Sequence, residues 1–357
     1  MPSPTQLLLT WYDQNKRDLP WRRDKDPYHI WLSEIMLQQT RVEAVKGYYA
    51  RFLALFPDVQ ALADASTEDV LKAWEGLGYY SRARNLHKAA KEVTDKWQGH
   101  FPDTYDGLLS LPGVGPYTAG AIASIAFDRA VPAIDGNVYR VMSRFQGVRE
   151  DIAAPSVQKT IRQEVVQLLN THRPGDLNQA LMELGATVCT PTSPKCDSCP
   201  WQSLCDAFSE GDMEQLPVHE KKKPPKIIPM AVGMVTYNRK ILVSKRNQKM
   251  LQGMYVFTLL EDETRPEVCQ DLLNEMGLRC SFVKKLGEGR HVFTHRVWEM
   301  EYLHFELSEL PEDAVLSSMN AFLADASQLA ALPIPSAMKE ACNHAMKLIG
   351  REKNGKS

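Results

Sequence analysis

The sequence has no hydrophobic run long enough to cross a membrane. Its 357 residues contain nothing close to the 18 or more consecutive apolar residues of a spanning helix. The N-terminal stretch MPSPTQLLLTWYDQ lacks the basic segment of a secretory signal, and Asp13 ends its short apolar run. We therefore expect a cytoplasmic protein that has no membrane partner.

An excess of positive charge is also missing. Lys and Arg total 42 against 44 Asp and Glu, for a formal net charge of −2. Residues 1–208 repeat this balance, with 22 basic and 24 acidic side chains. No general positive field attracts a polyanion, so binding to one must depend on locally placed cations and backbone amides.

The cysteines do not suit a disulfide framework, because there are seven of them and no export signal. Four of them fall within 17 residues: Cys189, Cys196, Cys199 and Cys205. Clustered thiolates are what structural zinc and iron–sulfur clusters both require. Only one pair has the Cys-x2-Cys spacing typical of zinc sites, so the spacing alone leaves zinc and iron–sulfur open.

The length and the change of pattern predict two domains. Apolar residues recur at helical spacing in 5–208, while 209–226 (SEGDMEQLPVHEKKKPPK) is typical of an exposed linker. Beyond the linker, strands are predicted at 230–236, 240–245 and 297–307, and helices at 266–277 and 335–349. We expect a mostly α-helical domain over 1–208 and a smaller α/β domain over 227–350.

A glycine-rich turn lies between two predicted helices in 111–120 (LPGVGPYTAG). Gly113 and Gly115 permit a tight turn that exposes backbone N–H groups beside a helix N-terminus, an arrangement suited to a phosphate. A plain sharp corner is the alternative interpretation.

Two carboxyl groups occupy contrasting positions. Glu34 shares a helix face with apolar residues, which favours its neutral form, although a buried ion pair with an arginine is the simpler alternative. Asp135 precedes a predicted helix, so it is first of all an N-cap, and amide donors there favour the ionised form. A neutral acid and a carboxylate together suit cleavage of a glycosidic bond.

These segments together resemble the helix-hairpin-helix DNA glycosylases and, within that superfamily, the MutY-type adenine DNA glycosylases. The resemblance rests on the hairpin, the following Asp135, the four cysteines over 189–205, and the stretches 19–42 and 74–90. It implies a 4Fe–4S cluster on the cysteines. Some relatives also bind a cation at the hairpin, which extends the expectation to a monovalent cation, Ca²⁺ or Mg²⁺ there.

The resemblance also implies a reaction. A monomer would bind double-stranded DNA, associated with the nucleoid if the source is bacterial, and flip out adenine paired with 8-oxoguanine or guanine. Glu34 would protonate the base, Asp135 would stabilise the sugar cation, Tyr117 and Asn137 would support it, and Arg22 would contact the base. Further expected DNA contacts are Leu37, Gln39, Thr40, Leu77, Tyr79, Gly113 and Gly115.

Two features narrow the activity. Relatives with lyase activity carry a Schiff-base lysine where this sequence has Tyr117, so we expect a monofunctional glycosylase. Glu34 is typical of the adenine-specific family and is missing from the thymine-glycol-type relatives.

The C-terminal region resembles a Nudix domain with a broken hydrolase motif over 270–278 (QDLLNEMGL). The arginine is missing and the acidic cluster that would bind Mg²⁺ is reduced. In the adenine glycosylase family this domain reads the damaged guanine through a Phe-Ser-His loop, which here is Phe293, Thr294 and His295. Threonine keeps the hydroxyl and adds a methyl group.

Three alternatives remain at this point. A nucleic-acid-binding protein without catalysis is disfavoured by the presence of both Glu34 and Asp135. A Nudix pyrophosphohydrolase with a helical accessory domain is disfavoured by the broken motif. A lyase-type glycosylase is the nearest alternative within the superfamily, and Tyr117 argues against it.

Overall fold

The computed structural model describes residues 2–219 and 224–350, which divide into two compact units. Of these residues, 2–64 and 85–219 form the first unit, and 65–84 and 224–350 form the second. The predicted domain boundaries at 208 and 227 remain a prediction. The prediction placed residues 65–84 in the helical domain, whereas the structure groups this short segment with the C-terminal region.

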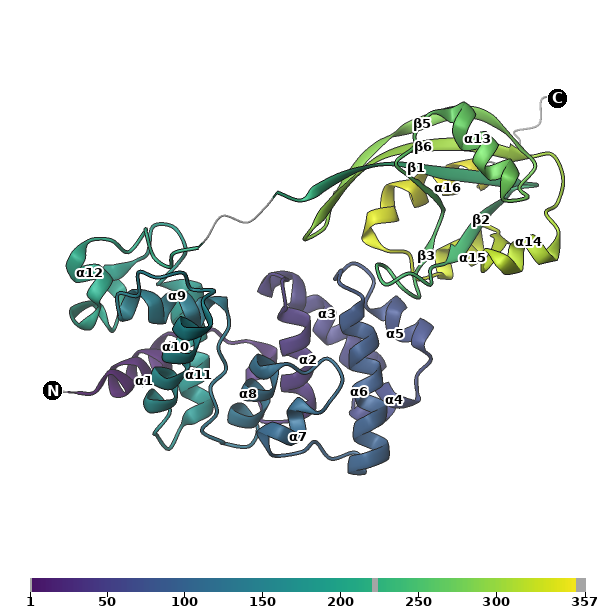
Figure 1. Ribbon diagram of the computed structural model, residues 1–357. Coiled ribbons are helices and arrows are strands. Elements are labelled where there is room, and N and C mark those ends of the chain that lie inside the picture. Colours follow the sequence, from purple (N-terminus) through teal and green to yellow (C-terminus); the bar gives the residue numbers. More distant parts are fainter. Residues whose placement is uncertain (1, 220–223, 351–357) are drawn as a thin grey trace, which may run out of the picture. The chain divides into compact units, whose positions relative to one another are not determined.

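Helices build the first unit (Figure 1). Their bounds are α1 Pro4–Asn15, α2 Pro27–Leu37, α3 Val42–Leu55, α4 Val59–Asp64, α6 Ser81–Trp97 (which begins in the second unit), α7 Tyr105–Leu109, α8 Pro116–Ile125, α9 Gly136–Phe145, α10 Pro155–Leu168, α11 Pro174–Thr187 and α12 Asp206–Glu210, with 3-10 turns at Pro20–Arg22, Cys196–Ser198 and Gln202–Leu204.

Two helices at the centre of this unit are enclosed almost completely. α2 buries eight of its eleven residues, and α8 buries every residue from Thr118 to Ile125. A helix that is apolar on all sides belongs in a protein interior. Any polar side chain on α2 that faces α8 is therefore removed from bulk water.

The remaining core of the first unit joins α1, α9, α10 and α11 to the cysteine loop. Its fully buried members include Leu8, Met142, Ile161 and Leu181, with Trp201 of the loop at 1% exposure. The Trp201 indole N–H donates to the Pro4 carbonyl (2.8 Å), which ties the loop to the first helix. The cysteine loop is thus packed as part of the core.

Part of the predicted linker is ordered on the first unit. Leu216 is buried, and its carbonyl accepts a hydrogen bond from Arg144 Nε (2.9 Å). The amide of Ile152 donates to the Val218 carbonyl (3.0 Å). The predicted linker positions 220–223 lie outside the described residues.

The second unit contains a mixed sheet in the order β3-β2-β1-β6-β5, with β4 paired to β1 and β7 to β2. β1 and β6 run parallel and the other pairs are antiparallel. The bounds are β1 Lys226–Tyr237, β2 Lys240–Lys245, β3 Tyr255–Val256, β4 Thr258–Glu261, β5 Cys280–Val292, β6 Arg296–Leu307, β7 Ala321–Ala324, α5 Thr67–Ala73, α13 Pro266–Glu275, α14 Asp313–Ser318, α15 Ala326–Ala331 and α16 Lys339–Ile349, with a 3-10 turn at Ser336–Met338.

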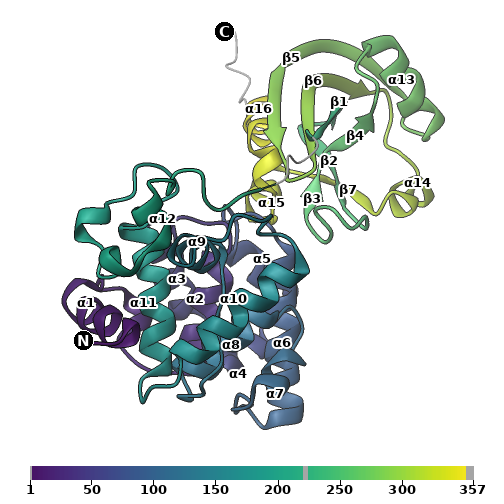
Figure 2. The same ribbon diagram turned by 60° about the vertical axis from the view of Figure 1, so that its left-hand side comes forward.

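Both faces of this sheet are covered, which explains its long apolar strands. Alternate residues of β1 point to opposite sides: Met230 and Val232 join one core with α16, while Ala231 and Val235 join another with α13. α13 and α16 accordingly lie on opposite faces of the sheet (Figure 2).

The fold class expected from the sequence is confirmed: a helical unit with a cysteine loop and a smaller α/β unit. Each predicted strand corresponds to an observed one, in β1, β2 and β6, and the predicted helices correspond to α13 and to the turn plus α16. Within residues 2–219 and 224–350, no helix has both the length and the apolar character needed to cross a membrane.

Candidate active site

A cavity of about 530 Å³ opens in the first unit where α2, α8, α9 and α11 meet. This volume is in the range of pockets that hold small organic ligands. The cavity is lined by eight of the residues singled out from the sequence: Arg22, Glu34, Leu37, Gln39, Thr40, Tyr117, Asp135 and Asn137. Residues from three separate parts of the chain, 22–40, 117 and 135–137, are therefore brought to one site.

Glu34 is held on α2 away from water, at 7% exposure. The hydroxyl of Tyr117, on α8, donates to Glu34 Oε2 (2.5 Å). The pKa of Glu34 is raised to about 7, mainly by burial and to a smaller extent by the neighbouring charge of Asp135, while the Tyr117 hydrogen bond and Arg22 oppose the rise. A carboxyl with this pKa can carry a proton near neutral pH.

Asp135 occupies the opposite kind of environment. It is the N-cap of α9, and its Oδ1 accepts from the Val138 amide (2.8 Å). The Asn137 side-chain amide donates to Oδ2 (2.7 Å). These two bonds engage both oxygens of the Asp135 side chain and fix its orientation at the start of α9.

A short hydrogen-bond chain connects Asp135 with the cysteine loop. Arg140 Nη2 donates to Asn137 Oδ1 (2.8 Å), and Arg140 Nε donates to the Cys189 carbonyl (2.9 Å). Arg140 is buried, so these bonds are shielded from water. The orientation of Asn137, and through it of Asp135, depends on the position of the loop backbone at Cys189.

Glu183 is a charged residue of the cavity that the sequence did not reveal. It lies on α11, is fully buried, and lines the cavity. Its carboxylate accepts from Arg17 Nε (2.6 Å) and Arg22 Nη2 (2.8 Å), and the two guanidinium groups lower its pKa. Arg22, expected to contact a base, is therefore fixed at the cavity wall by Glu183.

Gln39 and Gly113 adopt left-handed backbone conformations at the two expected DNA-contact segments of this unit. Gln39 follows α2 with φ +58° and is exposed. Gly113 has φ +77°, and a Cβ there would come within 2.6 Å of the Asn85 Cβ, so the hairpin turn requires glycine. Gly115 caps α8 ahead of Pro116, which leaves the first amides of α8 available for an anion.

The four clustered cysteines line one small cavity beside Arg144. Burial raises the pKa of the Cys199 thiol to about 11 and also raises the pKa of Cys205, so their thiolates need a nearby cationic group. Arg144 Nη1 lies 3.4 Å from Cys189 Sγ. Among the described residues, no three His, Cys, Asp or Glu side chains converge closely enough for a single metal ion. Four thiols around one small cavity are a donor set that an iron–sulfur cluster can use.

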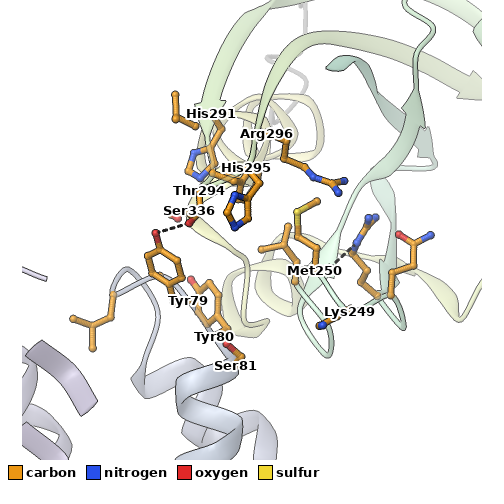
Figure 3. Close-up of a pocket in the computed structure, with 18 of the residues that line it drawn as sticks. Tyr79, Tyr80, Ser81, Lys249, Met250, His291, Thr294, His295, Arg296 and Ser336 are labelled. Carbon is orange, nitrogen blue, oxygen red and sulfur yellow. Dashed lines mark hydrogen bonds between the residues drawn. The ribbon is translucent and has the colours of Figure 1, made fainter. Parts of the chain in front are cut away.

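The second unit holds a separate set of the expected residues around a cavity of about 940 Å³ (Figure 3). Tyr79 is 48% exposed and has φ +47°, whereas Leu77 is buried. The Tyr79 hydroxyl lies 3.2 Å from Thr294 Oγ1, and either atom can donate. The Leu77–Tyr79 loop and the predicted recognition loop thus meet within this unit.

The recognition loop is a tight hairpin between β5 and β6. The Phe293 amide donates to the Arg296 carbonyl (2.8 Å). The Phe293 ring packs edge-to-face on Trp298, with the ring centroids 4.8 Å apart. Phe293 therefore anchors the hairpin, while Thr294 and His295 remain exposed at its tip.

On α13, two positions of the broken Nudix motif now have structural partners. The Gln270 side-chain oxygen accepts from the Phe282 amide (2.7 Å), and Asn274 Oδ1 accepts from the Cys280 amide (2.9 Å). These bonds attach α13 to the start of β5. Gln270, at the position of the missing arginine, and Asn274, at the position of one acidic residue, thus bind the backbone of β5.

Comparison with known protein families agrees with this architecture. Residues 32–167 match the model described as HhH-GPD superfamily base excision DNA repair protein. Residues 189–205 match the iron-sulfur binding domain of endonuclease III, and residues 231–344 match the NUDIX domain. The cysteine loop is thus an iron–sulfur binding domain, and its cofactor is a 4Fe–4S cluster.

Individual proteins similar to this chain identify the family within this superfamily. The chain is 38% identical over 349 residues to the adenine DNA glycosylase of Homo sapiens, covering 81% of this chain and 64% of the relative. It is 32% identical over 310 residues to that of Buchnera aphidicola subsp. Acyrthosiphon pisum, covering 86% of this chain and 88% of the relative. A solved structure of a thermostable thymine-DNA glycosylase has a TM-score of 0.54 at 29% identity, covering 58% of this chain and 95% of that one.

The chain belongs to the adenine DNA glycosylase family. It spans 64% of the length of the human relative and 42% of that of the mouse relative.

The raised pKa of Glu34 predicts that the free energy of unfolding falls as the pH rises. The folded protein, with a Glu34 pKa of about 7, holds the proton more tightly than the unfolded chain at 4.5. The stabilising contribution of the neutral acid is therefore complete below pH 4.5 and is lost as the pH rises through 7. Each pKa unit corresponds to about 1.4 kcal/mol, so Glu34→Gln should be more stable than the parent above pH 8 by up to about 3 kcal/mol.

Urea unfolding of both proteins at pH 4.5 and 8.5 measures this difference. Glu43→Gln is the matched control, because Glu43 is an exposed glutamate on α3. A Glu34→Gln effect that is the same at both pH values would contradict the raised pKa.

Proposed function

We propose that the protein is a monofunctional adenine DNA glycosylase that hydrolyses the N-glycosidic bond of adenine paired with 8-oxoguanine or guanine in double-stranded DNA. The observation that carries this proposal is the pairing of a protonatable Glu34 with an anionic Asp135 in one cavity. An adenine within a duplex is inaccessible to both groups, so the base has to be flipped into the cavity.

The two carboxyl groups have different roles in the reaction. Glu34 donates a proton to the adenine ring, at N7 by its family role, so that the base leaves as a neutral molecule. Asp135 remains ionised and stabilises the positive charge that develops on the sugar. Asn137 holds Asp135 in place, and Tyr117 holds Glu34.

Arg22 supplies a donor at the cavity wall where the flipped base would lie. Four hydrogen bonds from Arg17 and Arg22 occupy both oxygens of Glu183. Glu183 therefore acts as a positioning residue that keeps the guanidinium of Arg22 directed at the base.

Further DNA contacts come from loops, some at the cavity wall and some beyond it. Gln39, Thr40 and Tyr79 reach the duplex, and the amides near Gly113 and Gly115 hold a backbone phosphate. Leu77 is buried in this structure, so its insertion into the base stack requires a movement of its loop.

We propose Cys189, Cys196, Cys199 and Cys205 as the ligands of the 4Fe–4S cluster. When bound, the cluster cross-links four points of the loop. Arg144 stabilises the same loop, because it donates to the carbonyls of Thr190 (2.7 Å) and Pro191 (3.0 Å).

The cysteine ligands predict the metal content. Purified protein should contain about four irons per chain, and Cys199→Ser should lower that number. Cys269→Ser, which changes a buried cysteine of the second unit, is the control and should leave the iron content unchanged. Stoichiometric zinc without iron in anaerobically purified protein would rule out the assignment.

Substitution of Glu34 tests the reaction itself. Glu34→Gln keeps the size and polarity of the side chain but cannot deliver a proton, so single-turnover excision of adenine opposite 8-oxoguanine should fall by ~10²–10⁴-fold or more. Binding to the same duplex should persist. Excision within a few-fold of the parent rate would show that Glu34 is structural.

Thr294 tests the reading of the opposite base. 8-Oxoguanine differs from guanine by an oxygen at C8 and a hydrogen on N7, and the Thr294 hydroxyl can bond that edge. Thr294→Ala should reduce the preference for 8-oxoguanine over guanine by about 1–2 kcal/mol, the scale of one shielded hydrogen bond.

Thr294→Ser keeps the hydroxyl and is the control that should be nearly silent. The measured quantity is the ratio of single-turnover excision rates on the two duplexes. Identical ratios for the parent and Thr294→Ala would place the recognition elsewhere.

A further inference from the structure

The cavity of the second unit carries positive charge that the base-reading residues do not explain. The charged side chains of its wall are four cations, Arg84, Arg246, Lys249 and Arg296, and a single carboxylate, Glu261. Figure 3 shows the Arg296 side chain directed from the hairpin toward Met250, on the side where Lys249 lies. Four cations against one carboxylate give the cavity a net positive charge.

Arg246 is built into the wall. Its side chain is 10% exposed, and its Nε donates to the Met250 carbonyl (2.9 Å). The guanidinium lies over the ring of Trp298, 5.9 Å from the ring centroid. The Glu261 carboxylate is 3.8 Å away and is itself half exposed, so it compensates the buried charge only in part.

Arg296 adds to the excess of positive charge in this cavity instead of compensating it. No ion pair of Arg296 is present among residues 2–219 and 224–350. Burial lowers the pKa of Arg246, Glu261 raises it, and the charge of Arg296 lowers it. Two guanidinium groups that repel each other at a partly desolvated wall are stabilised by an anion between them.

We propose that Arg246, Arg296 and Lys249 form a phosphate-binding site. Arginine offers paired N–H donors that match two phosphate oxygens, and a fixed Arg246 has little side-chain entropy left to lose. The site adjoins Thr294, so the phosphate belongs to a nucleotide whose base lies at the hairpin tip. The phosphate chemistry stands on the cavity alone, whereas its assignment to a DNA strand rests on the proposed function.

The salt dependence of binding tests this site in the full-length protein. The probe is a duplex with a tetrahydrofuran abasic site opposite 8-oxoguanine or guanine, which cannot be turned over. Each phosphate contact on duplex DNA contributes about 0.9 to the slope of log K against log salt. Arg296→Gln and Lys249→Gln should each lower that slope by about this amount, and should weaken binding to both duplexes equally.

Two variants serve as controls. Arg296→Lys retains the charge and should keep most of the slope. Arg290→Gln removes an exposed arginine from the neighbouring strand β5 and should leave the slope unchanged. Single-turnover excision by the parent and by Arg290→Gln, measured on the corresponding duplexes with adenine in place of the abasic site, tests the proposed glycosylase activity separately.

A second arm identifies the source of the phosphate. Titration with dGMP, followed by calorimetry, should show binding that Arg296→Gln removes if the site takes a free nucleotide. A lower salt slope with duplex DNA and no effect on dGMP identifies a phosphodiester of the strand. Unchanged salt slopes for both Arg296→Gln and Lys249→Gln, together with unaltered dGMP binding, would overturn the phosphate site.

Discussion

The exclusion of water from Glu34 is the constraint on which the first unit depends. A carboxyl buried between two apolar helices costs least when it is neutral and hydrogen-bonded, and Tyr117 supplies that bond. A lysine at 117 would place a positive charge beside Glu34 and favour its carboxylate. The tyrosine therefore does two things at once: it removes the amine that a lyase needs, and it leaves Glu34 able to hold a proton.

Asp135 works beside Glu34 because its surroundings are polar where those of Glu34 are not. Its two partners belong to the first turn of α9, and that turn is fixed from behind by Arg140 and the Cys189 carbonyl. A displacement of the cysteine loop would therefore reach Asp135 through Arg140 and Asn137. The iron–sulfur domain thus supports the geometry of the site from a position outside the cavity.

The sequence indicated those features of the site that depend on local pattern. Glu34 on an apolar helix and Asp135 at a helix start are short-range signals, and so are the apolar, β-branched and aromatic runs of β1 and β6. Glu183 could not be recognised, because its partners Arg17 and Arg22 are about 160 residues away along the chain. β5 was missed as well, since two register shifts interrupt its alternation. The grouping of 65–84 with the C-terminal region depends only on tertiary contacts.

The second unit shows why a Nudix domain can keep the exposed hairpin around Thr294 without the hydrolase motif. α13, which carries the motif positions, packs on the sheet face of Leu303 and Phe305. Trp298, which supports both Phe293 and Arg246, belongs to the core on the other face. Because a strand alternates its side chains between faces, substitutions on the α13 side leave the hairpin and its cavity intact. Metal-binding groups can thus be replaced by residues that brace β5 while the opposite face continues to present Thr294 and the cations beside it.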